Sequence, residues 1–132
     1  MQVFSIKSAA FAALTALACA GTAWADTKDY EFQLVQNETK IGDGAVISVR
    51  LVDKRNRKPA ADAVIMAKRI DMAPDGMPTM TAPLEQLPST EPGIYRFKTN
   101  LMMQGGWQLS LAAKVQGETG TVENRLILKA IE

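Results

Sequence analysis

Hydrophobic and polar residues alternate along much of the chain. Every second side chain is apolar in four runs, residues 30–34, 45–51, 95–101 and 107–115. This period places the apolar side chains on one face of a β-strand and the polar ones on the other. Residues 64–70 and 122–130 are apolar enough to be strands, although they alternate less regularly. The pattern therefore predicts six strands, and no segment shows sustained helical spacing.

Turn-forming residues separate these runs. Glycine, proline or clustered charge occurs at residues 42–44, 54–59, 91–93, 104–106 and 116–120. Such residues end strands and favour tight reversals of the chain. With a candidate seventh strand over residues 81–87, the spacing predicts an immunoglobulin-like antiparallel β-sandwich of about seven strands, with a closed barrel as the alternative.

The longest predicted connection runs from Asp71 to Pro92. It carries five of the chain's 6 prolines and little regular alternation. Proline lacks the N–H that a sheet requires, and connections of this length in a compact domain are usually functional or disordered. We therefore expect an irregular loop here.

The first 25 residues have the composition of a signal peptide. Lys7 precedes a run of alanine, leucine and phenylalanine over residues 9–20, and Ala-Trp-Ala at residues 23–25 is a small-x-small cleavage site. Cleavage would leave residues 26–132 as one periplasmic sandwich domain with no membrane insertion.

Two other fates of this leader are weaker alternatives. An uncleaved anchor is disfavoured because the apolar run is short for a bilayer span. A lipid on Cys19 is disfavoured because Ala16 stands where bacterial lipoproteins usually carry leucine. Export with cleavage is therefore the preferred interpretation.

The residues after position 25 include neither cysteine nor histidine. This composition excludes a Ser-His-Asp or Cys-His nucleophile and any imidazole-based zinc or copper(II) site. No carboxylate pair falls in a recognisable acid–base motif, so we do not expect an enzyme. Without Lys7, 14 of the 15 basic residues remain to balance 14 acidic ones, and a charge near zero argues against nucleic acid as a partner.

Five methionines occupy two of the predicted connections. Met72, Met77 and Met80 lie in the proline-rich segment, and Met102 and Met103 precede a glycine pair. A thioether sulfur is soft, neutral and unprotonated, which suits copper(I) or silver(I) and not hard ions. These five residues are therefore predicted metal ligands, if the long connection folds back along the sheet and brings the two groups together.

Methionine also fills gaps in cores and forms adaptable contact surfaces. Met66 is predicted to be core, because it lies in an expected strand on the face of Val64 and Ile70. For the other five, a metal-free docking surface for another envelope protein is an alternative to metal binding. Trp107 is predicted to fill the core, with shielding of a metal site as its second interpretation.

The turn at residues 54–59 carries four basic residues, Lys54, Arg55, Arg57 and Lys58. A cluster of this kind is usually the solvated tip of a hairpin. Docking of an acidic partner is the less favoured interpretation.

Three stretches carry a family resemblance. They are DKRNRKPAADAVI at residues 53–65, EPGIYRFK at residues 91–98 and MQGGWQLSLAAKV at residues 103–115. Together they resemble the Asp…Lys-Pro…Ala-x-Val, Pro-Gly-x-Tyr and Met-x-Gly-x-Trp elements of the YtkA-like domains and the related FixH proteins. The similarity extends over most of the chain after residue 25.

The resemblance implies an immunoglobulin-like module outside the cytoplasm, associated with copper handling, metal efflux or oxidase assembly. It implies ligand roles for Met72, Met77, Met80 and Met103, whereas Met102 has no counterpart in the family. The absence of histidine departs from many periplasmic copper proteins and argues for copper(I) rather than copper(II). We therefore predict a non-catalytic periplasmic module that holds copper(I) for transfer or resistance, with an efflux or oxidase-assembly component as partner.

Overall fold

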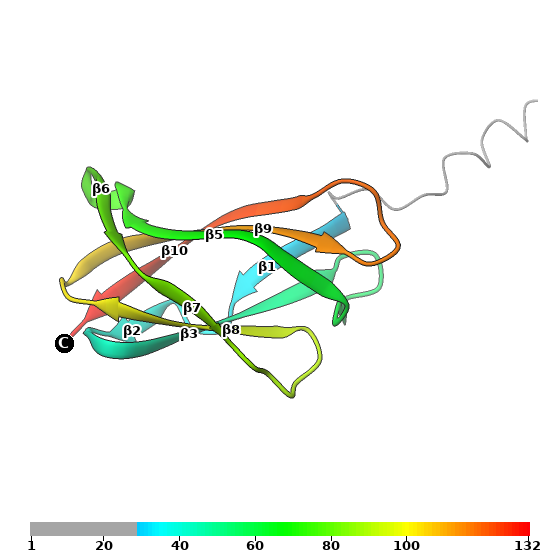
Figure 1. Cartoon of the computed structure of the whole chain (residues 1–132), viewed down its shortest axis with the longest axis horizontal. Coiled ribbons are helices and arrows are strands. Elements are labelled where there is room, and N and C mark those ends of the chain that lie inside the picture. Colours follow the sequence, from blue (N-terminus) through cyan, green and yellow to red (C-terminus); the bar gives the residue numbers. More distant parts are fainter. Residues whose placement is uncertain (1–28) are drawn as a thin grey trace, which may run out of the picture.

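The computed structural model describes residues 29–132, which form two β-sheets packed face to face (Figure 1). The first sheet contains, in order, β1 (Tyr30–Leu34), β3 (Gly42–Asp53), β8 (Ile94–Leu101) and β7 (Leu84–Leu87), with β4 (Lys58–Pro59) beside β3. The second contains β2 (Glu38–Lys40), β10 (Val122–Ile131), β9 (Gly105–Val115), β5 (Ala63–Met72) and β6 (Met77–Ala82). The predicted leader, its cleavage site and Cys19 lie outside the described residues.

The strand order is that of an immunoglobulin-like sandwich. The strands can be given the letters used for immunoglobulin domains. One sheet then has the order A, B, E, D, formed by β1, β3, β8 and β7. The other has the order G, F, C, C′, formed by β10, β9, β5 and β6. The short β2 pairs in parallel with β10. The N-terminal part of the domain therefore supplies an edge strand to each sheet, β1 to the first and β2 to the second. The predicted fold class is confirmed.

The segment from Asp71 to Pro92 is not the irregular loop that we expected. It contains the 3-10 turn η2 (Ala73–Asp75), followed by β6 and β7. β6 pairs with β5 in one sheet and β7 pairs with β8 in the other, so the chain changes sheets at Pro83. Proline is tolerated at such a crossing and in an edge strand such as β6, because no ladder partner needs its N–H.

The inward side chains of the alternating strands form one core. Its largest fully buried members include Phe32, Ile47, Leu51, Phe97 and Leu109. Trp107 is 2% exposed, which confirms its predicted place in the core. Burying one such side chain stabilises the fold by about 1.5–3 kcal/mol.

Met66 does not belong to this core, contrary to our prediction. Its side chain is 63% exposed, and that of Val64 is 64% exposed. The pairing of β5 with β9 shifts register between Ile65 and Ala67, so Met66 is the extra residue of a β-bulge. A one-residue insertion reverses which face each following side chain occupies, and the sequence pattern alone does not locate it.

Tyr95 links the two sheets through its hydroxyl group. The phenol donates a hydrogen bond to the carbonyl oxygen of Ala60 at 2.9 Å and accepts one from the amide of Ala63, at the start of β5, at 3.3 Å. Its ring packs edge-on against Phe32, with centroids 6.2 Å apart. Burial raises the pKa of the Tyr95 phenol above its ordinary value, which keeps the hydroxyl protonated and able to donate.

Thr99 carries a buried hydroxyl that makes no hydrogen bond within residues 29–132. The residue lies in β8 and is 2% exposed. Since an unsatisfied buried hydroxyl is destabilising, Thr99→Val is expected to raise the free energy of unfolding by about 1 kcal/mol, measured by urea denaturation. The exposed Thr79→Val serves as the control and is expected to have little effect; a loss of stability in Thr99→Val would show that the hydroxyl has a partner.

Candidate functional site

The five methionines predicted as ligands lie in three environments. Met72 is fully buried, and Met77 is half-buried and packs against the core. Met80 and Met103 are each 40% exposed, and Met102 is 70% exposed. Three thioether side chains are therefore open to a ligand, whereas Met72 is enclosed by the folded chain.

The η2 turn, which lies between Met72 and Met77, contacts the start of β9, which follows Met102 and Met103, at one end of the sandwich (Figure 1). The amide of Gly106, at the start of β9, donates a hydrogen bond to Asp75 Oδ2 of η2 at 3.2 Å. A Cβ atom on Gly106 would lie 3.0 Å from Pro74 Cβ, and one on Gly105 would lie 3.1 Å from Met72 Cε. The glycine pair thus allows the η2 turn to approach the β9 backbone closely.

A buried acid fixes the start of this turn. Asp71 is 4% exposed, and its carboxylate accepts hydrogen bonds from Arg69 Nε and from the amide of Ala73, both at 2.9 Å. Arg69 Nη2 also donates to the carbonyl oxygen of Pro78 at 2.8 Å. Arg69 and Asp71 together hold both ends of the β5–β6 connection.

The middle of β6 bulges away from β5. Met77 is the register partner of Met72, and Thr81 is the partner of Asp71, so residues 78–80 have no counterpart in β5. Met80 lies in this unmatched segment, which explains its exposure on an edge strand. The bulge is therefore the structural reason that a methionine of β6 reaches solvent.

Trp107 holds the other methionine connection in place. Its indole Nε1 donates a hydrogen bond to the carbonyl oxygen of Met103 at 3.0 Å. The backbone of Met103 is thereby tied to a core side chain, while the side chains of Met102 and Met103 remain exposed. No sequence pattern predicts this bond, because it depends on how the turn between β8 and β9 folds back.

Other metal-binding side chains do not gather in the described part of the chain. Within residues 29–132, no three histidine, cysteine, aspartate or glutamate side chains form a group that could hold a metal ion. No helix in the same part is long and apolar enough to cross a membrane.

The basic turn between β3 and β4 is more than the solvated tip of a hairpin, because one of its arginines is structural. Arg55 donates to Asp53 from Nε at 3.0 Å and from Nη2 at 2.8 Å. These hydrogen bonds hold the pKa of the Asp53 carboxyl below its ordinary value. Arg55 Nη2 also donates to the hydroxyl of Tyr30, which donates to Glu118 at 3.1 Å, so this network joins the β3–β4 turn, the start of β1 and the β9–β10 turn at the end opposite η2.

The family model for YtkA-like domains matches residues 25–112. The chain belongs to the YtkA-like family. The matched range includes both methionine connections of this YtkA-like domain and ends within β9. The resemblance read from the three sequence stretches is thereby confirmed.

Two solved structures are similar to this YtkA-like domain in shape. The filamin domain of Lin-41 has a TM-score of 0.48 at 18% identity, covering 83% of this chain and 98% of that one. The C-terminal domain of ZirS has a TM-score of 0.45 at 11% identity, covering 84% of this chain and 71% of that one. No curated protein matches the sequence. The strand order itself defines the immunoglobulin-like fold of the domain.

Proposed function

We propose that this YtkA-like domain is a periplasmic copper(I)-binding module whose ligands are methionine thioethers at the η2 end. The observation that carries the proposal is the contact of Pro74 and Asp75 with the glycine pair at residues 105–106. This contact joins the η2 turn, which precedes Met77 and Met80, to the start of β9, which follows Met102 and Met103. We propose that the two methionine groups, which are separate in sequence, converge at this end of the fold.

Met80, Met102 and Met103 are the proposed surface ligands, since their side chains are exposed. Met77 is half-buried three residues before Met80 and completes the set, whereas Met72 supports the site from the core and is not itself accessible. Three thioethers suffice for a trigonal copper(I) site, and silver(I) has the same preference. A site without protonatable ligands does not lose affinity through protonation in mildly acidic conditions.

Exposure of the ligands favours transfer over storage. An ion held by side chains that reach solvent is available to an incoming ligand from another envelope protein, so the ion passes by ligand exchange without a chemical reaction. The buried Asp71 and Trp107 hold the two connections in register while their methionines remain free to exchange. An efflux or oxidase-assembly component is the proposed partner.

The ligand assignment is tested by the triple variant Met80→Leu, Met102→Leu, Met103→Leu. Leucine and methionine have similar volumes, so the fold is expected to survive while the soft donors are lost. We expect the variant to fail to compete with a chromophoric copper(I) chelator under anaerobic conditions, whereas the wild-type chain from residue 26 competes.

Met66→Leu is the matched control for this experiment, because Met66 is also exposed, at 63%, but lies in the β5 bulge on the face of the second sheet. It is expected to bind copper(I) as the wild type does. Stoichiometric copper(I) binding by the triple variant, with its circular dichroism spectrum unchanged, would show that these three methionines are not the ligands.

A metal-free docking surface is the second candidate function. The observation that favours it is the 70% exposure of Met102 beside two further exposed methionines, because adaptable apolar side chains are typical of contact surfaces. Two results together would support this candidate instead. The wild-type chain would bind an envelope partner but no copper(I), and the triple variant would no longer bind that partner.

A further inference from the structure

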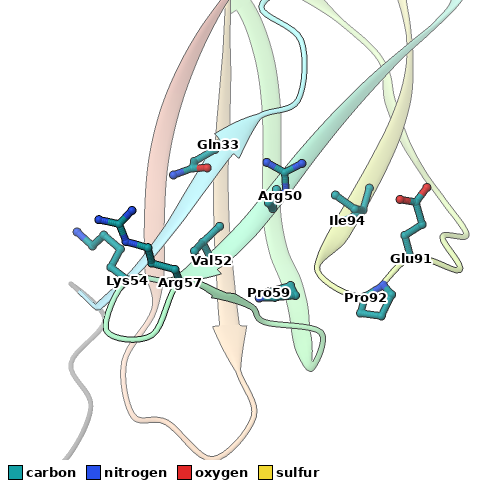
Figure 2. Close-up of a pocket in the computed structure, with 9 residues that line it drawn as sticks. All are labelled: Gln33, Arg50, Val52, Lys54, Arg57, Pro59, Glu91, Pro92 and Ile94. Carbon is teal, nitrogen blue, oxygen red and sulfur yellow. The ribbon is translucent and has the colours of Figure 1, made fainter.

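A concave surface lies on the outer face of the first sheet, away from the methionines. Its volume is about 760 Å³, and its principal lining residues are Arg50, Val52, Lys54, Arg57, Pro59 and Ile94. Figure 2 shows Lys54 and Arg57 on one side, Arg50 in the middle, and Glu91 with Pro92 on the other. We call this surface the basic trough.

The positive charge of the basic trough is not balanced within the described fold. Arg50, Lys54 and Arg57 line it with a single acid, Glu91. Within residues 29–132 the salt bridges are made by Arg55 and Arg69, and no side chain of those three cations takes part in one. The turn thus directs Arg55 to a structural role and leaves its neighbours free to meet an anion from outside.

Arg57 occupies a backbone conformation that favours glycine. Its φ is +59°, and it is the one residue other than glycine with positive φ in residues 29–132. The turn is closed by a hydrogen bond from the Arg57 amide to the carbonyl oxygen of Asp53 at 2.7 Å. Glycine would be less strained at this position, so the arginine side chain is a candidate for a role outside the turn.

The floor of the basic trough is apolar. Figure 2 shows Val52 between Arg57 and Arg50, Pro59 below Arg50, and Ile94 between Arg50 and Glu91, with Pro92 at the edge. A volume of about 760 Å³ is within the range of whole ligand sites and far exceeds that of a single carboxylate or phosphate group. The trough is half open to solvent, so an extended chain can lie in it.

We infer that the basic trough binds an acidic peptide segment of a partner protein, with an apolar side chain between its carboxylates. Charge complementarity and the apolar floor together select this occupant. The basic turn lies at the end of the sandwich opposite η2 and β6, so a docked partner leaves the methionine end open (Figure 1). The inference goes beyond the proposed function and does not depend on metal binding.

The test uses a fluorescein-labelled peptide in which aspartate and leucine alternate, titrated against the chain from residue 26 at low salt. Arg57→Gly is the first variant, because glycine fits the turn and removes the charge without loss of stability. Arg50→Gln is the second. Arg125→Gln is the matched control, since it removes one exposed cation from the outer face of the second sheet.

We expect each trough variant to weaken peptide binding about three- to fivefold, the two together at least about tenfold, and the control to change it little. Backbone amide resonances of Gln33, Val52 and Ile94 should shift on titration, and added salt should weaken binding. Equal affinity in all variants would overturn the inference. So would binding of phosphatidylglycerol vesicles, lost in the trough variants, without any binding of the peptide.

Discussion

Replacing Trp107 with alanine is expected to lower the free energy of unfolding by about 3–5 kcal/mol. The indole is 2% exposed at the start of β9, where it fills the space between the sheets. Its removal leaves a cavity and frees the Met103 carbonyl oxygen from its hydrogen bond. Since domains of this size have a total stability of about 5–15 kcal/mol, this loss is a large share of the total.

Trp107→Phe separates packing from hydrogen bonding in this prediction. Phenylalanine keeps an aromatic ring in the core but has no N–H for Met103, so a smaller loss of about 1–2 kcal/mol is expected. Both variants are measured by urea denaturation followed by circular dichroism. A loss below about 1 kcal/mol for Trp107→Ala would contradict the buried position of the indole.

Replacing Gly93 with alanine is expected to lower the free energy of unfolding by about 2–4 kcal/mol. Gly93 has a φ of +79°, and a Cβ atom there would clash with Pro59 Cβ and lie 3.1 Å from Pro59 Cα. Pro59 has little freedom to move aside, because its ring is closed onto its own backbone nitrogen. The Gly93 carbonyl oxygen also accepts a hydrogen bond from Leu51 at 2.8 Å, so displacement would disturb the centre of the first sheet.

Gly76→Ala is the matched control for this substitution. Gly76 has nearly the same φ, +77°, but an added Cβ would have no atom within 4 Å. Its expected cost is the conformational strain alone, about 1 kcal/mol. The free energy of unfolding of both variants is measured by thermal and urea denaturation, and the difference between their losses is the cost of the clash. Equal losses would contradict the close approach of Gly93 to Pro59.

The sandwich was predictable because most of its strands bury one face. The alternation of residues 45–51 and 107–115 identifies β3 and β9, whose inward side chains form much of the core. The candidate strand over residues 81–87 contains β7, whereas β6 was not predicted, because an edge strand buries little and tolerates proline, so its sequence lacks the alternating pattern. Met66 was misplaced because a bulge depends on pairing with a distant strand.

The candidate site was predictable in its chemistry but not in its geometry. Residue type alone identifies Met80, Met102 and Met103 as soft donors on connections, and their exposure is consistent with that role. Met72 is buried because it is the last residue of β5, whose final three residues are buried. We did not predict this burial, because we expected an irregular loop from Asp71 onward. The contact of Asp75 with Gly106 spans 31 residues, and no local pattern predicts it.

The basic turn shows how one short motif divides its residues between two roles. The sequence indicates only that four cations share a hairpin tip. The fold turns Arg55 towards Asp53 and leaves Lys54 and Arg57 facing the hollow that Arg50 completes from β3. Because Arg50 comes from the strand before the turn, the basic trough emerges only when the strands are paired.

The most direct test of the central claim is an anaerobic copper(I) competition titration of the chain from residue 26, with a chromophoric chelator and a histidine-free tag, followed by X-ray absorption spectroscopy of the loaded protein. The account predicts stoichiometric binding tight enough to compete with the chelator, with sulfur as the nearest neighbour of copper. Titration curves that match the chelator alone would contradict it and leave the exposed methionines as a docking surface.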